Sequence, residues 1–469
     1  MGNIVVAGGG MCGLAAAMVL ADDGHRVVVL ERDEAGPPAD PAAAFNAWDR
    51  RSIAQFGLAH WLHARGTSIL RRDLPSVQAL LEGNGGYRFN LVKYLLSVQA
   101  GATEEPDDDR FDQVTGRRST LEWAMATAAA AHAGVTVRRG VVIAGLSTGA
   151  SVAAGIPHVD GVRLASGEVV PADVVIDATG RRSATPTWLA AIGAPPPHEA
   201  AEDSGFAYYG RYYRSPDGSV PGIIGPLLAP LGSFSVLTLP ADNGTWSVTL
   251  YGLSEDKPLR RFRDPAVHER VVRACPLHAH WLDGEPINDI VSMAGIVDRH
   301  RRFVVDGRPC ATGLLTVGDA SSCTNPSLGR GITFGLMHVE VLRAAVAAHL
   351  DDPLELAIEF DRRTEAELRP WHDATRTMDR RRVHEMQDHI AGRTPEADPA
   401  GAIGDALVAN AASDPVATRA FGDIFSCIAT AEEVFARPGV FDHIAGLAGS
   451  ISVDPLPGPD RTQLLDLVS

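Results

Sequence analysis

A glycine-rich turn between an apolar strand and an alanine-rich helix is the feature that most constrains this fold. Residues 4–7 predict a buried strand, residues 14–22 a helix, and residues 25–31 (HRVVVLE) a second strand. The turn between the first strand and the helix has the spacing G-x-G-x-x-G, through Gly8, Gly10 and Gly13. A unit of this kind begins a parallel sheet and binds a dinucleotide at the turn.

Each glycine of the turn has its own physical reason. Gly8 permits the tight turn, Gly10 lets the backbone approach phosphate, and Gly13 allows close packing of helix on strand. The helix N-terminus offers free N–H groups and a positive dipole end to a pyrophosphate. Two alternatives stay open for this motif alone: a turn that binds no ligand, and NAD in place of FAD.

An acidic residue follows the turn at the expected separation. Glu31 ends the second strand about 20 residues after Gly8, where a carboxylate accepts hydrogen bonds from ribose hydroxyls. The same carboxylate repels a 2′-phosphate, which disfavours NADP. We also expect nucleotide contacts from the neighbouring residues Met11, Cys12 and Arg32.

Two further segments lie far downstream in the chain. The segment VVIDATGRRS reads as a strand followed by a turn that contains Asp177 and Gly180. The segment GDASSCTNPSLGRGI precedes a helix-like stretch and contains the candidate site residues Gly318, Asp319, Pro326, Gly329, Gly331 and Ile332.

In this order, the three segments resemble those of the FAD-dependent monooxygenase superfamily of the para-hydroxybenzoate hydroxylase fold. The chain is most similar to its squalene-epoxidase-like and polyether-epoxidase-like bacterial branch, over roughly residues 3–380. The resemblance implies that Asp319 bonds the ribityl chain of FAD and that residues 326–332 pass close to the isoalloxazine. Gly329 and Gly331 would expose N–H groups near its N1–C2=O edge, where such donors stabilise negative charge on reduced flavin.

Shorter matches support the same resemblance. Arg118 resembles the family arginine that begins a helix and contacts FAD. The R-x-G-V-P-Q-x-x-x-x-H stretch of the epoxidase-like branch is matched by Arg50, Gln55 and His60, with Ser52 and Ala54 in place of its Gly and Pro. The form DATGRRS differs from the D-G form of the phenol hydroxylases, which is associated with both FAD and NAD(P)H handling. Direct docking of NAD(P)H is therefore in doubt.

The expected fold is α/β (α+β overall), with a glutathione-reductase-type, Rossmann-like FAD-binding domain. A sheet-rich substrate domain is inserted into it, and a helical C-terminal region follows. The expected boundaries are 1–75, 110–190 and 295–350 for the FAD-binding domain, 76–109 and 191–294 for the substrate domain, and 351–469 for the helical region.

Within the substrate domain, residues 234–239 and 245–251 alternate as two strands joined by a turn at 240–244. The apolar loop 220–228 is either a lid over an apolar substrate or packed against the sheet. Among the tyrosines at 208, 209, 212 and 213, the candidates for the substrate pocket are Tyr208, Tyr209 and Tyr213. The alternative is a strand in which one tyrosine of each pair points inward.

The resemblance implies a monooxygenase that inserts one oxygen atom, by epoxidation or hydroxylation, into an apolar small molecule of specialised metabolism. Reduced FAD would capture molecular oxygen as a C4a-hydroperoxide, with NADH or NADPH as the electron source, directly or through a separate flavin reductase. A conventional acid/base dyad is not required for epoxidation, and the catalytic residue stays unknown. His60 is the best titratable candidate, and a histidine satisfied by packing is the more common alternative.

Three rival functions share these motifs. A reductase or dehydrogenase of the geranylgeranyl-reductase type is the main alternative. A flavin halogenase needs a channel lysine and a W-x-W-x-I-P signature, but the signature is missing and Lys93 lies in no matching context. A flavoprotein that binds FAD without catalysis is a further alternative.

Composition excludes several other classes of protein. The formal charge of −16 argues against nucleic-acid binding and against an anionic membrane surface. Five scattered cysteines fit a reducing cytoplasm, and no residue spacing predicts a metal site. We see no signal peptide and no apolar run long enough to span a membrane, and we therefore expect a cytoplasmic enzyme.

Overall fold

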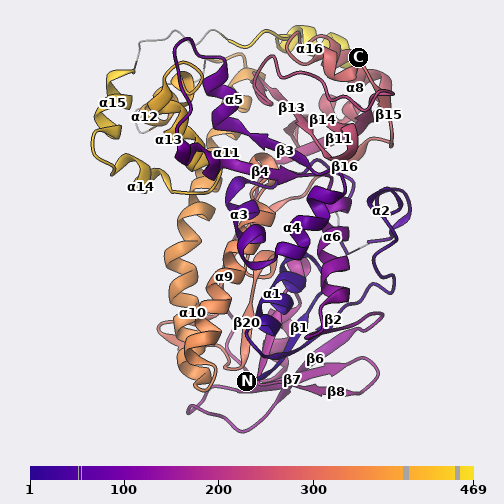
Figure 1. Ribbon diagram of the computed structural model, residues 1–469, viewed down its shortest axis with the longest axis vertical. Helices are drawn as coiled ribbons and strands as arrows, with labels where there is room; N and C mark the ends of the chain where they lie inside the picture. The colour runs from indigo at the N-terminus through magenta and orange to yellow at the C-terminus, as the bar shows by residue number, and fades with distance from the viewer. Residues whose placement is uncertain (51, 54, 395–400, 449–454) are drawn as a thin grey trace.

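A parallel sheet in the order β20-β9-β1-β2-β5 lies in the lower half of the molecule in Figure 1. The computed structural model describes residues 1–50, 52–53, 55–394, 401–448 and 455–469. The strands of this sheet are β1 (Asn3–Ala7), β2 (Arg26–Leu30), β5 (Val135–Arg138), β9 (Val174–Asp177) and β20 (Leu314–Thr316). Strands β1 and β9 are buried almost throughout, as is typical of parallel sheets covered on both faces.

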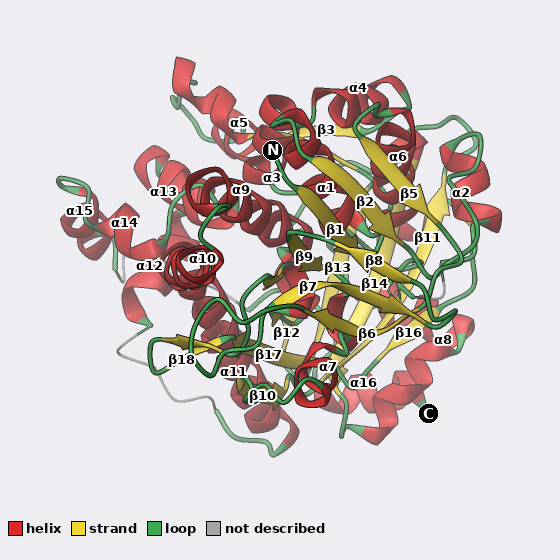
Figure 2. Cartoon of the chain, turned by 90° about the horizontal axis from the view of Figure 1, so that it is seen from below, coloured by secondary structure: helices red, strands yellow, loops and turns green. Residues whose placement is uncertain are grey.

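Helices cover one face of the parallel sheet, and a small antiparallel sheet covers the other (Figure 2). The predicted strand–turn–helix–strand unit is confirmed, because α1 (Met11–Asp22) connects β1 to β2. The alanines of α1 let it pack closely against α6 (Arg118–Ala131) and α9 (Gly331–His349). The opposite face carries β6 (Ile143–Thr148), β7 (Val159–Leu164) and β8 (Val169–Pro171).

Helix α9 corrects one expectation. By length and composition alone it is apolar enough to cross a membrane, although no such segment was expected from the sequence. In the structure, 61% of its apolar window is buried inside the protein. It belongs to the same hydrophobic core as α1, which accounts for its composition.

The upper part of Figure 1 holds a large antiparallel sheet in the order β12-β13-β14-β11-β15, with β16 also paired to β11. Its strands are β11 (Phe206–Arg214), β12 (Leu228–Leu231), β13 (Phe234–Pro240), β14 (Thr245–Leu253), β15 (Glu285–Pro286) and β16 (Val291–Met293). The predicted hairpin is confirmed, since β13 and β14 pair antiparallel around the 3-10 helix η3 (Asp242–Gly244).

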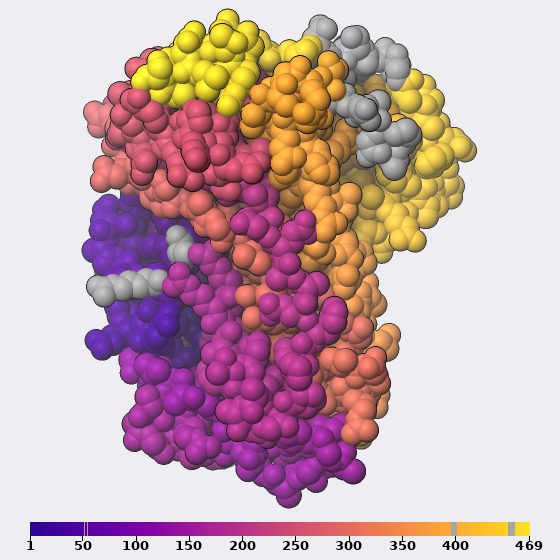
Figure 3. Space-filling model, turned by 180° about the vertical axis from the view of Figure 1, so that it is seen from behind, coloured from indigo at the N-terminus to yellow at the C-terminus, as the bar shows by residue number. Residues whose placement is uncertain are grey.

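Helices follow the last core strand, as predicted for the C-terminal region. They are α10 (Pro353–Glu367), α11 (Arg369–Ile390), α12 (Ala402–Asn410), α13 (Pro415–Phe425), α14 (Ala431–Phe435), α15 (Val440–Gly446) and α16 (Arg461–Val468). Helices α12 to α15 share a small core of their own. Helix α16, yellow in Figure 3, packs against α8 (Pro265–Arg273) at the end of the molecule that holds the large antiparallel sheet.

Shorter elements connect these layers. The helices are α2 (Pro41–Ala47), α3 (Ala64–Asp73), α4 (Pro75–Gly83), α5 (Leu91–Ser97) and α7 (Thr185–Ala191). The strands are β3 (Tyr87–Asn90), β4 (Asp112–Thr115), β10 (His198–Asp203), β17 (Val297–Arg302), β18 (Val304–Val305), β19 (Arg308–Pro309) and β21 (Ser322–Cys323). The fold is therefore mixed α/β, with an FAD-domain-like parallel sheet, a sheet-rich section and C-terminal helices. The exact domain boundaries stay a prediction.

Candidate functional site

The three sequence motifs meet at one edge of the parallel sheet. Gly8 follows β1, Ala178 follows β9, and Gly318 comes two residues after β20. These strands are neighbours in the order β20-β9-β1, and all run parallel. The carboxyl ends of parallel strands share one edge, and ligands of open α/β sheets bind there. Topology therefore brings together segments that lie more than 100 residues apart.

A cavity of about 380 Å³ runs along this edge and continues to the large antiparallel sheet. Most of the predicted site residues line it, namely Gly8, Gly10, Met11, Cys12, Glu31, Arg32, Arg50, Gln55, His60, Arg118, Gly180, Tyr208, Asp319, Pro326, Gly329, Gly331 and Ile332. The other predicted residues do not line it, namely Gly13, Asp177, Tyr209, Tyr213 and Gly318. Ala54 lies outside the described residues.

The glycines of the first turn serve different purposes in the structure. Gly8 has φ of +102°, and a Cβ there would lie 2.6 Å from the carbonyl oxygen of Ala178. A Cβ on Gly13 would lie 2.0 Å from the carbonyl oxygen of Gly8, so Gly13 serves the packing of helix on strand. Gly10 differs, because a Cβ there would meet no atom within 4 Å. Its open side faces the cavity.

Two helix N-termini reach the cavity. Gly10 precedes α1, and Gly331 is the first residue of α9. At both positions a Cβ would find open space, and both residues line the cavity. Each helix end carries free N–H groups and partial positive charge. The cavity therefore favours a ligand with negative or electron-rich groups at two separate places.

Glu31 and Arg50 form a buried polar group beside the glycine turn. Glu31 accepts hydrogen bonds from the backbone N–H of Gly9 at 2.6 Å and of Asp33 at 2.8 Å. Arg50 donates to the carbonyl oxygen of Gly9 and lies within 3.8 Å of the carboxylates of Glu31 and Glu122. Nη1 of Arg50 is buried without a hydrogen-bond partner among the described residues, and Nε, which also lacks one, lies 3.6 Å from the carboxylate of Asp33. Such donors are suited to a phosphate or a hydroxyl of a ligand.

The carboxylate of Asp177 is engaged within the protein. One oxygen accepts from the backbone N–H and the hydroxyl of Thr179, and the other accepts from the hydroxyls of Ser183 and Thr185. Its side chain is buried and does not reach the cavity. Asp177 thus shapes the turn after β9, and Gly180 (φ +78°) is the residue of this motif that lines the cavity.

His60, Arg118 and Asp319 bring three titratable side chains to the cavity wall. Burial, together with the charge of Arg118, lowers the pKa of His60 to about 3, so its ring is neutral. Nδ1 of His60 lies 2.9 Å from the carbonyl oxygen of Leu58 and must carry the proton, which leaves Nε2 as an acceptor 3.5 Å from Arg118. Burial raises the pKa of Asp319, and the charges of Arg118 and Arg181 oppose this shift.

The four tyrosines of β11 alternate between two faces of the sheet, and both faces are buried. Tyr209 and Tyr213 point into the core with Trp246 and Phe262, away from the cavity. Tyr208 lines the cavity and donates a hydrogen bond to Asn325 at 2.9 Å. Tyr212 donates to the carbonyl oxygen of Leu58. Of the three tyrosines predicted for the pocket, the structure therefore places only Tyr208 on its wall.

The sequence reasoning missed the apolar end of the cavity. Its walls there are Leu58, Leu237, Met293 and Ile296, with the hydroxyl of Thr249 among them. Leu237 and Thr249 face each other across β13 and β14, and Oγ1 of Thr249 is buried without a hydrogen-bond partner among the described residues. Strand alternation could have indicated this face, since Val248 and Leu250 point into the opposite core.

The apolar loop 220–228 is packed against the sheet and is not a lid. Val220, Ile223 and Leu227 contact the core behind the sheet. Carbonyl oxygens of the loop lie within hydrogen-bond distance of the side chains of Tyr94, His278 and His280. The cavity has no wall from this loop. Within the described residues, no cluster of three or more His, Cys, Asp or Glu side chains is arranged to hold a metal ion.

The cavity fits an FAD molecule by the chemistry of its walls. A pyrophosphate and a ribose are suited by the open glycines at two helix N-termini, the buried Nη1 donor of Arg50 and the carboxylate that follows β2. Pro326, Gly329 and Gly331 form a backbone wall at the other end. The resemblance described above predicts that these three residues lie beside the flavin ring.

Comparisons with known proteins agree with this fit. Residues 2–195 match the family model described as "FAD binding domain". Protein Rv3254 of Mycobacterium tuberculosis is 27% identical over 449 residues, which cover 91% of this chain and 90% of that protein.

Solved structures share the fold at low sequence identity. PqsL of Pseudomonas aeruginosa, described as a probable FAD-dependent monooxygenase, is 16% identical with a TM-score of 0.59, covering 82% of this chain and 99% of that one. A triple mutant of the flavin-dependent brominase Bmp2 is 15% identical with a TM-score of 0.60, covering 95% and 99%. The Diels-Alderase PyrE3 is 17% identical with a TM-score of 0.58, covering 91% and 81%. These likenesses show the fold, and the match of residues 2–195 supports FAD as the cofactor.

Proposed function

We propose that this protein is an FAD-dependent monooxygenase that inserts one oxygen atom into an apolar small molecule. One observation carries the proposal: a single cavity joins the cofactor motifs to an apolar pocket on the large antiparallel sheet. A substrate held against Leu237, Met293 and Ile296 would therefore lie next to the wall formed by Pro326, Gly329 and Gly331. When bound, reduced flavin supplies the oxygen-activating chemistry.

The protein's own residues bind, orient and exclude water. The positive end of α9 favours electron-rich groups at Gly331, and the apolar walls keep water from the substrate side. Neutral His60 offers an acceptor nitrogen, Nε2, on the cavity wall, 3.5 Å from Nη1 of Arg118. We assign it a positioning role there. Epoxidation, and membership of the squalene-epoxidase-like branch, stay predictions within this proposal.

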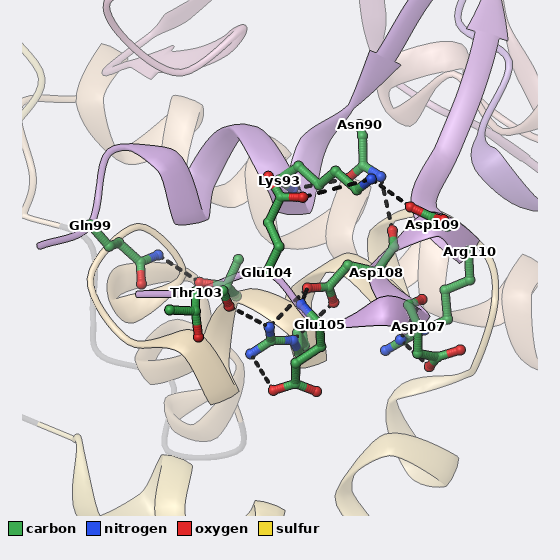
Figure 4. A network of polar contacts seen from close by, with 12 residues as sticks. Asn90, Lys93, Gln99, Thr103, Glu104, Glu105, Asp107, Asp108, Asp109 and Arg110 are labelled. Atoms are coloured by element: carbon green, nitrogen blue, oxygen red, sulfur yellow. Dashed lines mark hydrogen bonds and ion pairs between the residues drawn. The ribbon is translucent and has the colours of Figure 1, made fainter. Parts of the chain in front are cut away.

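The fold alone does not fix the reaction, because its solved examples include a brominase and a Diels-Alderase. The two lysines of the chain argue against halogenation. Lys93 lies 2.5 Å from Asp109 and 3.8 Å from Glu104, in a polar network outside the cavity (Figure 4). Lys257 also lies outside the cavity. No channel lysine of the kind a flavin halogenase uses is therefore present on the cavity wall among the described residues.

Labelled oxygen tests the proposal. The FAD-loaded protein is reduced under anaerobic conditions, mixed with a panel of apolar alkenes and phenols, and exposed to ¹⁸O₂. We expect one labelled atom in the product and the other in water. Reduction of an alkene without oxygen uptake would overturn the proposal in favour of a reductase of geranylgeranyl-reductase type. Halide incorporation in a parallel reaction with bromide would overturn it in favour of a halogenase.

The electron source is tested in the same system. NADH and NADPH are each supplied with and without a separate flavin reductase. We propose that the separate reductase is needed, because the turn after β9 has the DATGRRS form and Asp177 is engaged within the protein. Rapid reduction of the bound flavin by NADH or NADPH alone would contradict this.

A further inference from the structure

The cavity wall at Pro326 is held from behind by two buried carboxyl groups. Asp298 in β17 accepts a hydrogen bond from the backbone N–H of Asn325 at 2.5 Å. Asp379 in α11 accepts from Nδ2 of Asn325 at 3.0 Å and from the hydroxyl of Ser327 at 2.8 Å. Pro326 lies between these anchored residues and lines the cavity. The short segment is thus fixed on both sides by acids from two different elements.

The same contacts set the direction of a hydrogen bond inside the cavity. Oδ1 of Asp379 accepts the hydrogen bond from Nδ2 of Asn325, so the amide of Asn325 presents its NH₂ group to α11. The amide oxygen of Asn325 then faces Tyr208 and accepts the Tyr208 hydroxyl proton at 2.9 Å. The Tyr208 oxygen can therefore meet a ligand only as an acceptor.

We propose that Asp298 and Asp379 form a carboxyl clamp, a pair of positioning residues that fixes the Asn325–Ser327 wall and the orientation of Tyr208. The clamp gives the long helix α11 of the C-terminal region a role in the site. It further implies that a substrate in contact with Tyr208 carries a hydroxyl or N–H group. This substrate inference rests on the proposed function, whereas the clamp itself does not.

Both carboxyl groups of the clamp are buried, and neither forms an ion pair among the described residues. Burial raises the pKa of Asp379 to about 7, and the charge of Asp298 adds to this shift. The hydrogen bonds from Ser327 and Asn325 oppose it. Burial raises the pKa of Asp298 to about 6. Oδ2 of Asp379 is buried without a partner among the described residues. The charged and titratable groups that face the clamp are Glu202, Tyr208, Tyr251, Cys323, Arg330, Arg376 and Arg380.

Two variants of Asp379 separate its charge from its hydrogen bonds. Asp379→Asn keeps an oxygen that accepts from Asn325 and Ser327, and it removes the titration. Asp379→Leu removes the acceptor as well. Asp373→Asn is the matched control, since Asp373 lies on the same helix and pairs with Arg369 at 2.7 Å on the surface.

Hydrogen exchange of the FAD-free protein tests the clamp directly. We expect Asp379→Leu to raise amide exchange in residues 320–332 at least tenfold, and Asp379→Asn and Asp373→Asn to leave it within twofold. Unchanged exchange in Asp379→Leu would overturn the proposal whether or not the protein binds FAD. Failure of the wild-type protein to bind FAD would instead overturn the proposed function.

The spectrum of bound FAD gives a second readout. In the wild type we expect the visible absorption to change with pH with a midpoint near 7, because Asp379 ionises behind the wall. Asp379→Asn should abolish that change, and Asp298→Asn should lower the midpoint, since Asp298 contributes to the raised pKa of Asp379. An identical midpoint in wild type and Asp379→Asn would contradict the clamp.

Discussion

The glycine turn allows a test that separates folding from cofactor binding. Gly13 is closed in by protein, because a Cβ there would lie 2.0 Å from a backbone oxygen. Gly10 is open, and its φ of −85° suits any residue. Gly13→Ala should therefore destabilise the protein even without FAD, whereas Gly10→Asp should fold normally and bind FAD much more weakly.

The size of the Gly10→Asp effect follows from electrostatics. Two like charges about 4 Å apart repel by about 4 kcal/mol at an effective dielectric constant of about 20. Since about 1.4 kcal/mol corresponds to a tenfold change in affinity, FAD binding should weaken roughly 1,000-fold. Gly10→Asn is the matched control, because it adds nearly the same volume without the charge. It should weaken binding much less than Gly10→Asp.

Thermal unfolding with and without FAD, together with FAD titration by fluorescence, measures both effects. FAD at about 100 times its dissociation constant should stabilise the wild type by about 2.7 kcal/mol and Gly10→Asp by almost nothing. Without FAD, Gly10→Asp should melt with the wild type and Gly13→Ala clearly below it. Equal FAD affinity of Gly10→Asp and wild type would refute the assignment of the turn. A large loss of stability in FAD-free Gly10→Asp would refute the view that this position is open.

Three further predictions concern stability. Asp242→Ala should lower the free energy of unfolding by about 3–5 kcal/mol. Arg117 is almost fully buried 2.6 Å from Asp242, and among the described residues it would lose its only ion-pair partner. A loss below about 1 kcal/mol in chemical unfolding would contradict this. Thr249→Val should keep or raise the melting temperature of the FAD-free protein, since it removes an unpartnered buried hydroxyl, and a marked drop would show a missed partner. Asp298 and Asp379 have raised pKa values in the folded state, so the folded protein holds protons that the unfolded chain releases. Their contribution to the free energy of unfolding should therefore fall as pH rises from about 4 through 7. Melting temperatures of Asp379→Asn, measured across this pH range, should fall less than those of the wild type.

Local patterns made much of the fold predictable. The apolar run at 4–7, the glycine spacing and the alternation at 234–239 each depend on neighbouring residues, and each corresponds to an observed element. The parallel strands were readable because burial on both faces leaves continuous apolar runs. Helix α9 shows the limit of such patterns, since a core helix and a membrane helix have the same composition until its neighbours are known.

The predicted motif residues divide in the structure according to what their side chains contact. Asp177 has the spacing of the motif that the chain resembles, yet its carboxylate accepts hydrogen bonds from Thr179, Ser183 and Thr185 within the turn. Tyr209 and Tyr208 are adjacent in sequence, and strand alternation sends one into the core and the other to the cavity. Spacing alone indicates that a residue belongs to the site, but which side chains remain available to a ligand depends on contacts made by distant segments.

Asp379 shows why the rest of the site could not be read from the chain. It lies in a charged helix sequence, between Met378 and three arginines, where an exposed acid is the ordinary expectation. The structure turns it inward, and Arg382 binds the carbonyl oxygens of Gly232 and Phe234, which ties this helix to the large antiparallel sheet. Asp379 is thereby held behind the Asn325–Ser327 wall, which lies about 50 residues earlier in the chain. A buried carboxyl that forms no ion pair among the described residues is costly, and its retention at this wall is most simply explained if the wall must keep one conformation for the flavin and the substrate.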